Sequence, residues 1–204
     1  LKDRGLSFLR VSPLERPNFP TPLVRLVRQN MQYKEGSFQT TDDLRLYEQS
    51  WIPQEQSKAS IIIVHGSFEH SSRYAHVAKF LASNSYSVFT FDLRGHGKSQ
   101  GERAFVRSFD IHLDDLKIFL KNIQKSNPDK PIFMLGHSVG ATILVLFVLT
   151  HKPKIQGLML SAPTLKLNEG VPLIIRKISP ILGCIFPRLK LSKFDSRFLS
   201  QDPR

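Results

Sequence analysis

The stretch IFMLGHSVGATILVLF, residues 132–147, decides the fold, because it places one serine between two glycines and between two apolar runs. Residues 132–135 are apolar and rich in strand formers, which predicts a short buried strand. Residues 139–149 are apolar nearly all round, and their length is typical of a buried helix rather than a membrane span. A strand and a helix are therefore expected to meet at Ser138.

The junction itself, GHSVG at residues 136–140, has the pattern G-x-S-x-G of a nucleophile elbow. Glycines two positions before and after the serine leave room in a strained turn. The Ser138 hydroxyl would then stand at the carboxyl edge of the sheet, beside the free N–H groups that begin the helix. The alternative is a serine in an ordinary tight turn, but the flanking strand and helix favour the elbow. Ser138 is our candidate nucleophile.

Bulk composition limits the classes of function. The chain has 204 residues and a net charge of +12, of which residues 151–204 carry +7. A basic segment can serve nucleic acid, an anionic membrane or solubility; no nucleic-acid module is visible, so no nucleic-acid partner is expected. The single cysteine, Cys184, excludes an internal disulfide and a multi-cysteine zinc site. Residues 1–10 lack the apolar core of a signal peptide, and we expect a cytoplasmic protein.

Strand-like and helix-like segments alternate along the chain, which predicts an α/β fold with a mostly parallel sheet and helices on both faces. Two strand-like runs surround a Thr-Asp-Asp turn within residues 33–53. Buried strands are expected within 59–66, 86–92, 132–135 and 157–163, and helices within 72–84, 109–127 and 139–149.

Functional groups collect at the carboxyl ends of parallel strands. Three loops qualify there: HGSFEHSSRY, DLRGHGKSQGER and the elbow. A nucleophilic serine needs N–H donors for the oxyanion that forms on the substrate. We expect these donors to be the backbone N–H groups of Val139 and Ser67, with Gly66 letting the backbone approach.

The remaining polar residues of these loops have structural alternatives. We interpret His65 as a histidine bonded to loop backbone, and Asp92, Arg94 and His96 as a loop held by side-chain hydrogen bonds. Glu69, His70 and Arg73 either line the mouth of a substrate pocket or form a charge cluster at a helix start. His137 is a further pocket candidate, although its side chain should point away from the Ser138 hydroxyl.

Three motifs in this order and spacing carry a family resemblance: HGSFEHSSRYAHVAKFL, FDLRGHGKSQGER and GHSVGA. They resemble the monoglyceride lipase and lysophospholipase group of α/β-hydrolases, from about Tyr33 to the end. The resemblance implies Ser138 as nucleophile, Ser67 and Val139 as oxyanion donors, and a long-chain lipid monoester as substrate. It implies no metal and no organic cofactor. Ala141 departs from the group, which usually has a second glycine there.

A second departure concerns the residues that would activate Ser138. In this family the acid and then the histidine follow the serine along the chain. Here His151 is the only histidine that follows Ser138. None of the later acidic residues stands in the sequence context expected of the catalytic acid; they are Glu169, Asp195 and Asp202. We therefore expect the acid, the base and the last strands to lie beyond residue 204. Residues 1–32 are interpreted as an arm, 33–163 as the hydrolase core, and 164–204 as the start of a helical cap.

Two hypotheses follow. The first is a piece of a serine esterase whose 204 residues alone are nearly inert and end on an open sheet edge at 157–163. The second is a catalytically inactive lipid-binding or regulatory relic; we favour the first, because an intact elbow has little reason to persist without chemistry. The cap carries an apolar helical face bordered by basic residues, which suits peripheral contact with a membrane. The alternative is a cap that packs only on the core.

Overall fold

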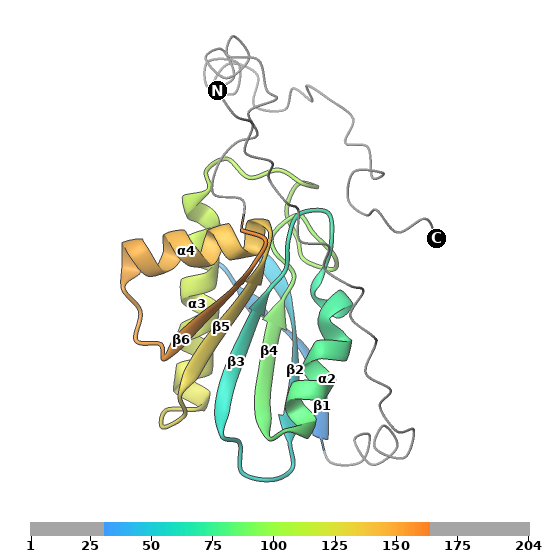
Figure 1. Cartoon of the computed structure of the whole chain (residues 1–204). Helices are drawn as coiled ribbons and strands as arrows, with labels where there is room; N and C mark the ends of the chain where they lie inside the picture. The colour runs from blue at the N-terminus through green and yellow to red at the C-terminus, as the bar shows by residue number, and fades with distance from the viewer. Residues whose placement is uncertain (1–30, 164–204) are drawn as a thin grey trace, which may run out of the picture.

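The computed structural model describes residues 31–163, which form a twisted sheet covered by helices (Figure 1). The sheet has six strands in the order β1-β2-β4-β3-β5-β6. The strands β3 to β6 run parallel to one another, whereas β1 and β2 pair antiparallel. The carboxyl ends of β3, β4 and β5 therefore meet at one edge of the sheet. The strands are β1 Met31–Gln39, β2 Arg45–Pro53, β3 Ala59–Val64, β4 Tyr86–Phe91, β5 Ile132–His137 and β6 Gly157–Ser161.

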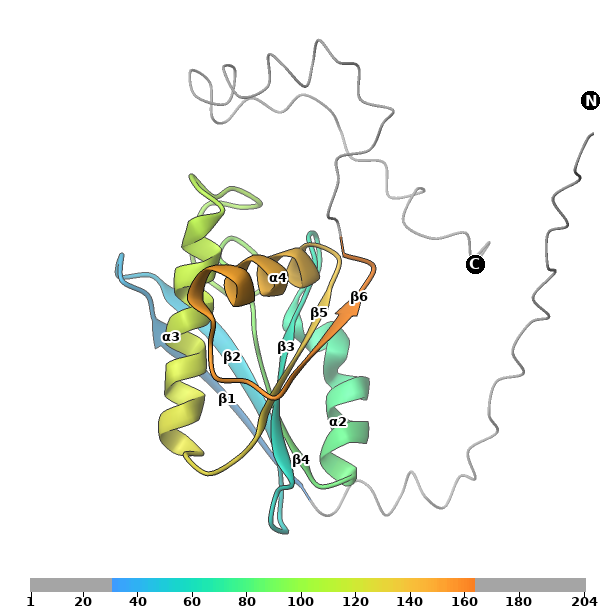
Figure 2. The ribbon, with the colours of Figure 1, turned by 60° about the vertical axis from the view of Figure 1, so that its left-hand side comes forward.

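The helices divide between the two faces of the sheet. A short 3-10 turn, η1 (Ser71–Tyr74), leads into α2 (Ala75–Ser83) on one face, and α3 (Asp110–Ser126) and α4 (Val139–His151) cover the other (Figure 2). The predicted arrangement is thus confirmed.

The central strand β3 shows how the sequence produces these layers. All six of its residues are buried. Ile62 and Val64 pack into the core under α3 and α4, and Ile61 and Ile63 pack into the core under α2. A strand between two helical layers needs apolar side chains on both faces, which explains the uninterrupted III run.

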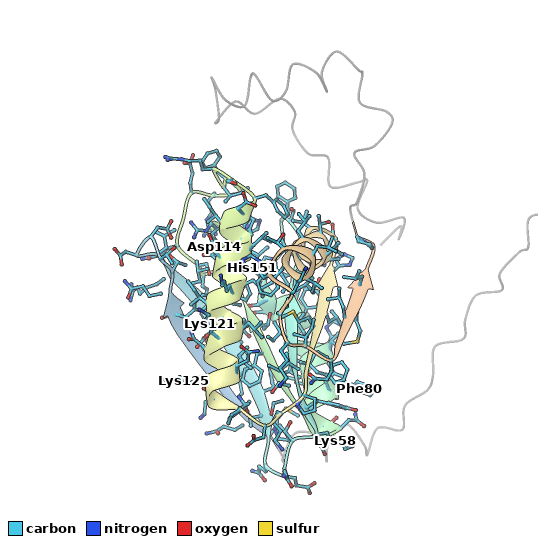
Figure 3. The ribbon with its side chains drawn as sticks, turned by 90° about the vertical axis from the view of Figure 1, so that its left-hand side faces the viewer. Lys58, Phe80, Asp114, Lys121, Lys125 and His151 are labelled. Carbon is cyan, nitrogen blue, oxygen red and sulfur yellow. The ribbon has the colours of Figure 1, made fainter. Side chains whose placement is uncertain are left out.

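The helix α3 has the opposite character, because only one of its faces is buried. Figure 3 shows Asp114, Lys121 and Lys125 along its outer side, where all three are exposed. Its apolar side chains recur at helical spacing and enter the core; they are Leu113, Leu116, Phe119, Leu120 and Ile123.

The segments predicted as strands and helices between residues 33 and 163 all form, and β1 already begins at Met31. As expected, β6 is the edge strand within residues 31–163, and Met159 and Leu160 are each 41% exposed. Residues 31 and 32, assigned to the arm from the sequence, belong to β1, whereas the rest of the arm and the whole predicted cap lie outside the described residues. No helix among those described is long and apolar enough to cross a membrane.

Candidate active site

Ser138 occupies a strained turn between β5 and α4. Its backbone has φ 52° and ψ −120°, a combination that residues other than glycine rarely adopt. Its N–H donates to the Ser161 carbonyl at 2.9 Å, and its carbonyl accepts from the Thr142 N–H at 3.1 Å. Strain of this kind persists only where the surroundings enforce it. The sharp strand-to-helix turn expected from the sequence is therefore present.

Two glycines make the turn possible by allowing backbone to touch backbone. A Cβ atom on Gly140 would lie 2.2 Å from the Val64 carbonyl oxygen, and one on Gly136 would lie 2.7 Å from the Cα of Ala141. Both distances are far below contact distance. The start of α4 thus packs directly on the ends of β3 and β5, which explains the glycine spacing around the serine.

The loop after β3 packs against the serine. A Cβ atom on Gly66 would lie 3.1 Å from the Ser138 Cβ. The Gly66 N–H donates to Glu69 Oε1 at 2.6 Å, so this N–H is already used. Among the described residues, no acceptor binds the N–H groups of Ser67 or Val139. Within the described part of the chain, both groups are thus unengaged at the carboxyl edge of the sheet, while their role as oxyanion donors stays a prediction.

A cavity of about 230 Å³ is bordered by both of these residues. Its wall includes an apolar run from the loop that precedes α3, which the sequence reasoning did not single out. The sequence signal for this wall was the pattern AFVRSF, residues 104–109, which places apolar side chains in a loop at the carboxyl edge of the sheet. The lining is Ser67, Phe68, Arg94, His96, Ala104, Phe105, Val106, Phe109, His112 and Val139.

The three residues proposed from the sequence for the substrate pocket are absent from the lining of that cavity. Glu69 accepts a hydrogen bond from the Tyr74 hydroxyl at 2.7 Å, and Arg73, whose side chain is 65% exposed, lies 3.4 Å from Glu69. His137 Nδ1 lies 3.0 Å from Ser161 Oγ. The contacts of Glu69 and Arg73 match the interpretation as a local charge cluster, and the substrate-binding role of all three stays a prediction.

His65 serves the fold, as predicted. Its side chain is fully buried, and its Nε2 accepts from the Leu93 N–H at 2.9 Å. The other nitrogen, Nδ1, therefore carries the proton and donates to the Gly66 carbonyl at 2.7 Å. Burial lowers the pKa of His65 to about 4, because the charged form would lose its hydration. With both nitrogens engaged, this imidazole has no nitrogen left to accept a serine proton.

The loop after β4 is also held by side-chain hydrogen bonds, as predicted. The Asp92 carboxylate is buried and accepts from the Ser71 N–H at 2.7 Å, the Ser71 hydroxyl at 2.6 Å and the Lys98 N–H at 2.7 Å. Arg94 binds Asp115 in a bidentate ion pair, and also binds Asp42 at 2.9 Å. These groups tie the loop to α3 and to η1.

Within residues 31–163 no histidine nitrogen is hydrogen-bonded to the Ser138 hydroxyl. His151 ends α4 and stacks on Phe147 with ring centroids 4.9 Å apart. A helix rises about 1.5 Å per residue, so His151 lies at the far end from Ser138. The same residues contain no group of three His, Cys, Asp or Glu side chains that could hold a metal ion.

These observations define the class of protein as an α/β-hydrolase. They are the strand order, the helices on both faces of the sheet and a serine on the turn after β5. Sequence comparison then gives the family. Residues 55–204 match the family described as serine aminopeptidase, S33 (Hydrolase_4), and the chain belongs to that family.

The individual proteins that the chain resembles include lipases and an esterase. The chain is 32% identical over 180 residues to a monoglyceride lipase of Rattus norvegicus, covering 87% of this chain and 59% of the relative. Among solved structures, a monoacylglycerol lipase of Paleococcus ferrophilus matches with TM-score 0.64 and 27% identity, covering 85% of this chain and 60% of the other. A thermostable carboxyl esterase from Bacillus coagulans, solved with glycerol, matches with TM-score 0.63 and 26% identity, covering 83% and 55%. The chain thus spans somewhat more than half the length of these relatives.

Proposed function

We propose that this chain supplies the nucleophile and the oxyanion donors of a serine hydrolase that acts on lipid monoesters. The observation that carries the proposal is the strained Ser138 turn, whose hydroxyl has no hydrogen-bond partner among the described residues. Part of the wall of the adjoining cavity is apolar and includes Phe68, Phe105 and Phe109, which suits the apolar part of an ester. The monoglyceride lipases among the relatives support a monoacylglycerol or lysophospholipid as substrate.

In this proposal the Ser138 oxygen attacks the ester carbonyl, and a base takes the serine proton. The carbonyl oxygen becomes an oxyanion that accepts hydrogen bonds from the Ser67 and Val139 N–H groups. Removal of one such donor typically costs about 10²- to 10³-fold in rate. The same base then protonates the leaving alcohol, and water releases the fatty acid from the acyl-enzyme. We place the base and its supporting acid beyond residue 204, as the family resemblance implies.

The test compares the 204-residue chain with a chain extended through the next acid and histidine of its coding sequence. Both are assayed on a short-chain nitrophenyl ester and on a monoacylglycerol. We expect turnover only from the extended chain, because a serine hydroxyl is a weak nucleophile without a positioned base. Comparable turnover by both chains would contradict the placement of the base. Lipid binding without turnover by the extended chain would favour the inactive relic instead.

The nucleophile is tested in the extended chain. Ser138→Ala should reduce ester hydrolysis to background, a loss of roughly 10⁴-fold or more. The matched control is Ser83→Ala, since Ser83 is exposed at the end of α2 and should be dispensable. Retained activity in Ser138→Ala would refute the assignment.

We further propose that the cap segment makes peripheral contact with membranes. The basis is the sequence pattern alone, in which Ile178 and Ile181 belong to an apolar helical face bordered by basic residues. Ile178→Ser combined with Ile181→Ser should weaken co-sedimentation with anionic vesicles. Equal binding before and after the substitutions would favour a cap that packs only on the core.

A further inference from the structure

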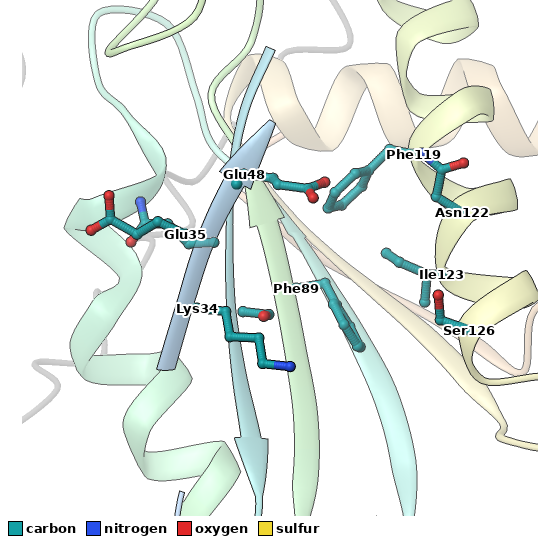
Figure 4. Close-up of a pocket in the computed structure, with 11 residues that line it drawn as sticks. Lys34, Glu35, Glu48, Phe89, Phe119, Asn122, Ile123 and Ser126 are labelled. Atoms are coloured by element: carbon teal, nitrogen blue, oxygen red, sulfur yellow. The ribbon is translucent and has the colours of Figure 1, made fainter. Parts of the chain in front are cut away.

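A second cavity lies between the antiparallel strands β1 and β2 and the second half of α3, away from Ser138 (Figure 4). It has a volume of about 220 Å³, and its apolar wall is formed by Phe89, Phe119 and Ile123. An engineered protein cavity of roughly 150 Å³ binds benzene. This cavity therefore has room for one aromatic ring and a small substituent.

Two carboxylate residues line the cavity, Glu35 and Glu48, and the side chain of Glu48 points toward Phe119 in Figure 4. Within residues 31–163 the Glu48 carboxylate forms no ion pair, and no hydrogen bond contributes to its pKa shift. The carboxylate of Glu35, by contrast, is paired with a cation, since it lies 3.1 Å from Lys98 Nζ. Burial raises the pKa of Glu48, because its charged form loses hydration without gaining a partner. A cation that entered the cavity would relieve this cost.

The two strands keep the carboxylate accessible. Gly36 lies opposite Glu48 in the β1–β2 register, and a Cβ atom there would come within 3.2 Å of Glu48 Oε1. The absence of a side chain at residue 36 thus leaves space beside the charge. Lys34 lines the same cavity but is exposed and forms no ion pair with Glu48. Asn122 and Ser126 of α3 add oxygen acceptors at the rim.

We propose that this cavity binds a small organic ammonium ion with an apolar body, its charge at Glu48 and its body against Phe89 and Phe119. The carboxylate and the aromatic faces both attract an ammonium group, and the apolar wall accepts the attached ring or alkyl chain. This ligand is distinct from the lipid ester proposed for Ser138, so the two proposals can fail independently.

Benzylammonium chloride is the probe, and the full chain is titrated by isothermal calorimetry or by NMR chemical shifts. We expect a dissociation constant in the millimolar range for benzylammonium. Benzyl alcohol, which has the same shape without the charge, should bind at least about tenfold more weakly. Absence of benzylammonium binding, or equal binding of the alcohol, would overturn the proposal.

Variants locate the binding. Glu48→Gln should weaken benzylammonium at least about tenfold, and a thermal unfolding curve checks that it is folded. Gly36→Val should also weaken binding, because it fills the cavity and leaves the charge in place. The matched control is Asp114→Asn, which removes an exposed carboxylate from the outer side of α3 and should leave binding unchanged. Binding that survives Glu48→Gln, or falls equally in Asp114→Asn, would show surface charge attraction and overturn the proposal.

Discussion

The loops after β3 and β4 and the turn after β5 meet at one edge of the sheet, yet they use their polar side chains in opposite ways. His65 and Asp92 are buried, and their side chains are hydrogen-bonded to neighbouring groups, His65 to the backbone of Gly66 and Leu93 and Asp92 to Ser71 and Lys98. The Ser138 hydroxyl has no such partner among the described residues, and its backbone is held at a positive φ. The side chains of His65 and Asp92 are thus hydrogen-bonded, whereas Ser138 combines a strained backbone with a hydroxyl that has no partner among the described residues.

The hydrogen-bonded side chains of His65 and Asp92 contribute to the stability of the fold, whereas Ser138 is the candidate reactive group. The bonds of His65 and Asp92 fix the loop that contains Gly66, and that loop packs on Ser138. A rigid frame therefore holds the strained serine, and the free energy of that strain is offset by the hydrogen bonds around it. Substitutions in the frame should lower the free energy of unfolding, and substitutions at the serine should not.

The largest effect is expected at Asp92. Asp92→Ala leaves the buried N–H group of Ser71 and the N–H group of Lys98 without an acceptor, and should lower the free energy of unfolding by about 3 kcal/mol or more. Urea unfolding measures the change. Asp129→Ala, at an exposed loop carboxylate, is the control and should have little effect. A small loss in Asp92→Ala would mean that the frame does not depend on this carboxylate.

A smaller effect is expected at His65, and it should depend on pH. The pKa of His65 is about 4 in the folded protein and 6.5 in its ordinary state, so between these values only the unfolded chain binds the proton. The wild type should therefore lose stability as pH falls through this window, by at most about 1.4 kcal/mol per pH unit for each such histidine. Burial gives His112 a pKa of about 4 as well, which adds a second contribution of the same sign.

The substitution His65→Gln tests this contribution. At pH 7 it should cost about 2 kcal/mol, because a buried hydrogen-bonded side chain is replaced. Near the lower end of the window its cost should shrink, since the wild type has by then lost the advantage of a neutral imidazole. Unfolding curves of both proteins at two pH values give the difference. A cost that stays constant with pH would contradict a proton-linked role for His65.

The smallest effect is expected at Ser138, and it has the opposite sign. Ser138→Gly should raise the free energy of unfolding by about 1 kcal/mol, because glycine adopts a φ of 52° without strain. Ser138→Ala keeps the strain and should change stability by less than about 0.5 kcal/mol. Thermal unfolding of the two variants measures both. A loss of stability in both would show that the hydroxyl also serves the frame, and would remove the contrast between the loops.

Much of the fold was predictable because its signals are local. The III run of β3 indicated a strand buried on both faces, and the spacing of Leu116, Phe119 and Ile123 indicated the amphipathic α3. The glycines around Ser138 indicated the sharp turn, which the structure contains. The structural interpretation of His65 and Asp92 was also confirmed, since both stand in glycine-punctuated loops.

The cavities were not predictable in this way, because they depend on elements far apart in the chain. Phe105 and Val106 border the cavity beside Ser67 only because their loop crosses the carboxyl edge of the sheet. Glu48 looks like an ordinary strand residue in sequence, and its burial follows from the packing of α3 against the β1–β2 pair.

The sequence by itself determined the order of strands and helices, the two-sided burial of β3 and the position of Ser138 on a turn, since these follow from side-chain periodicity and from the space that glycine leaves. Only the tertiary structure decided which polar groups are satisfied. The Gly66 N–H is bonded to Glu69 and the nitrogens of His65 are both engaged, whereas the Ser67 and Val139 N–H groups have no acceptor within residues 31–163. Hydrogen bonding requires donor and acceptor to lie within about 3 Å of each other. For residues on different loops, that distance is set by how the strands and helices pack.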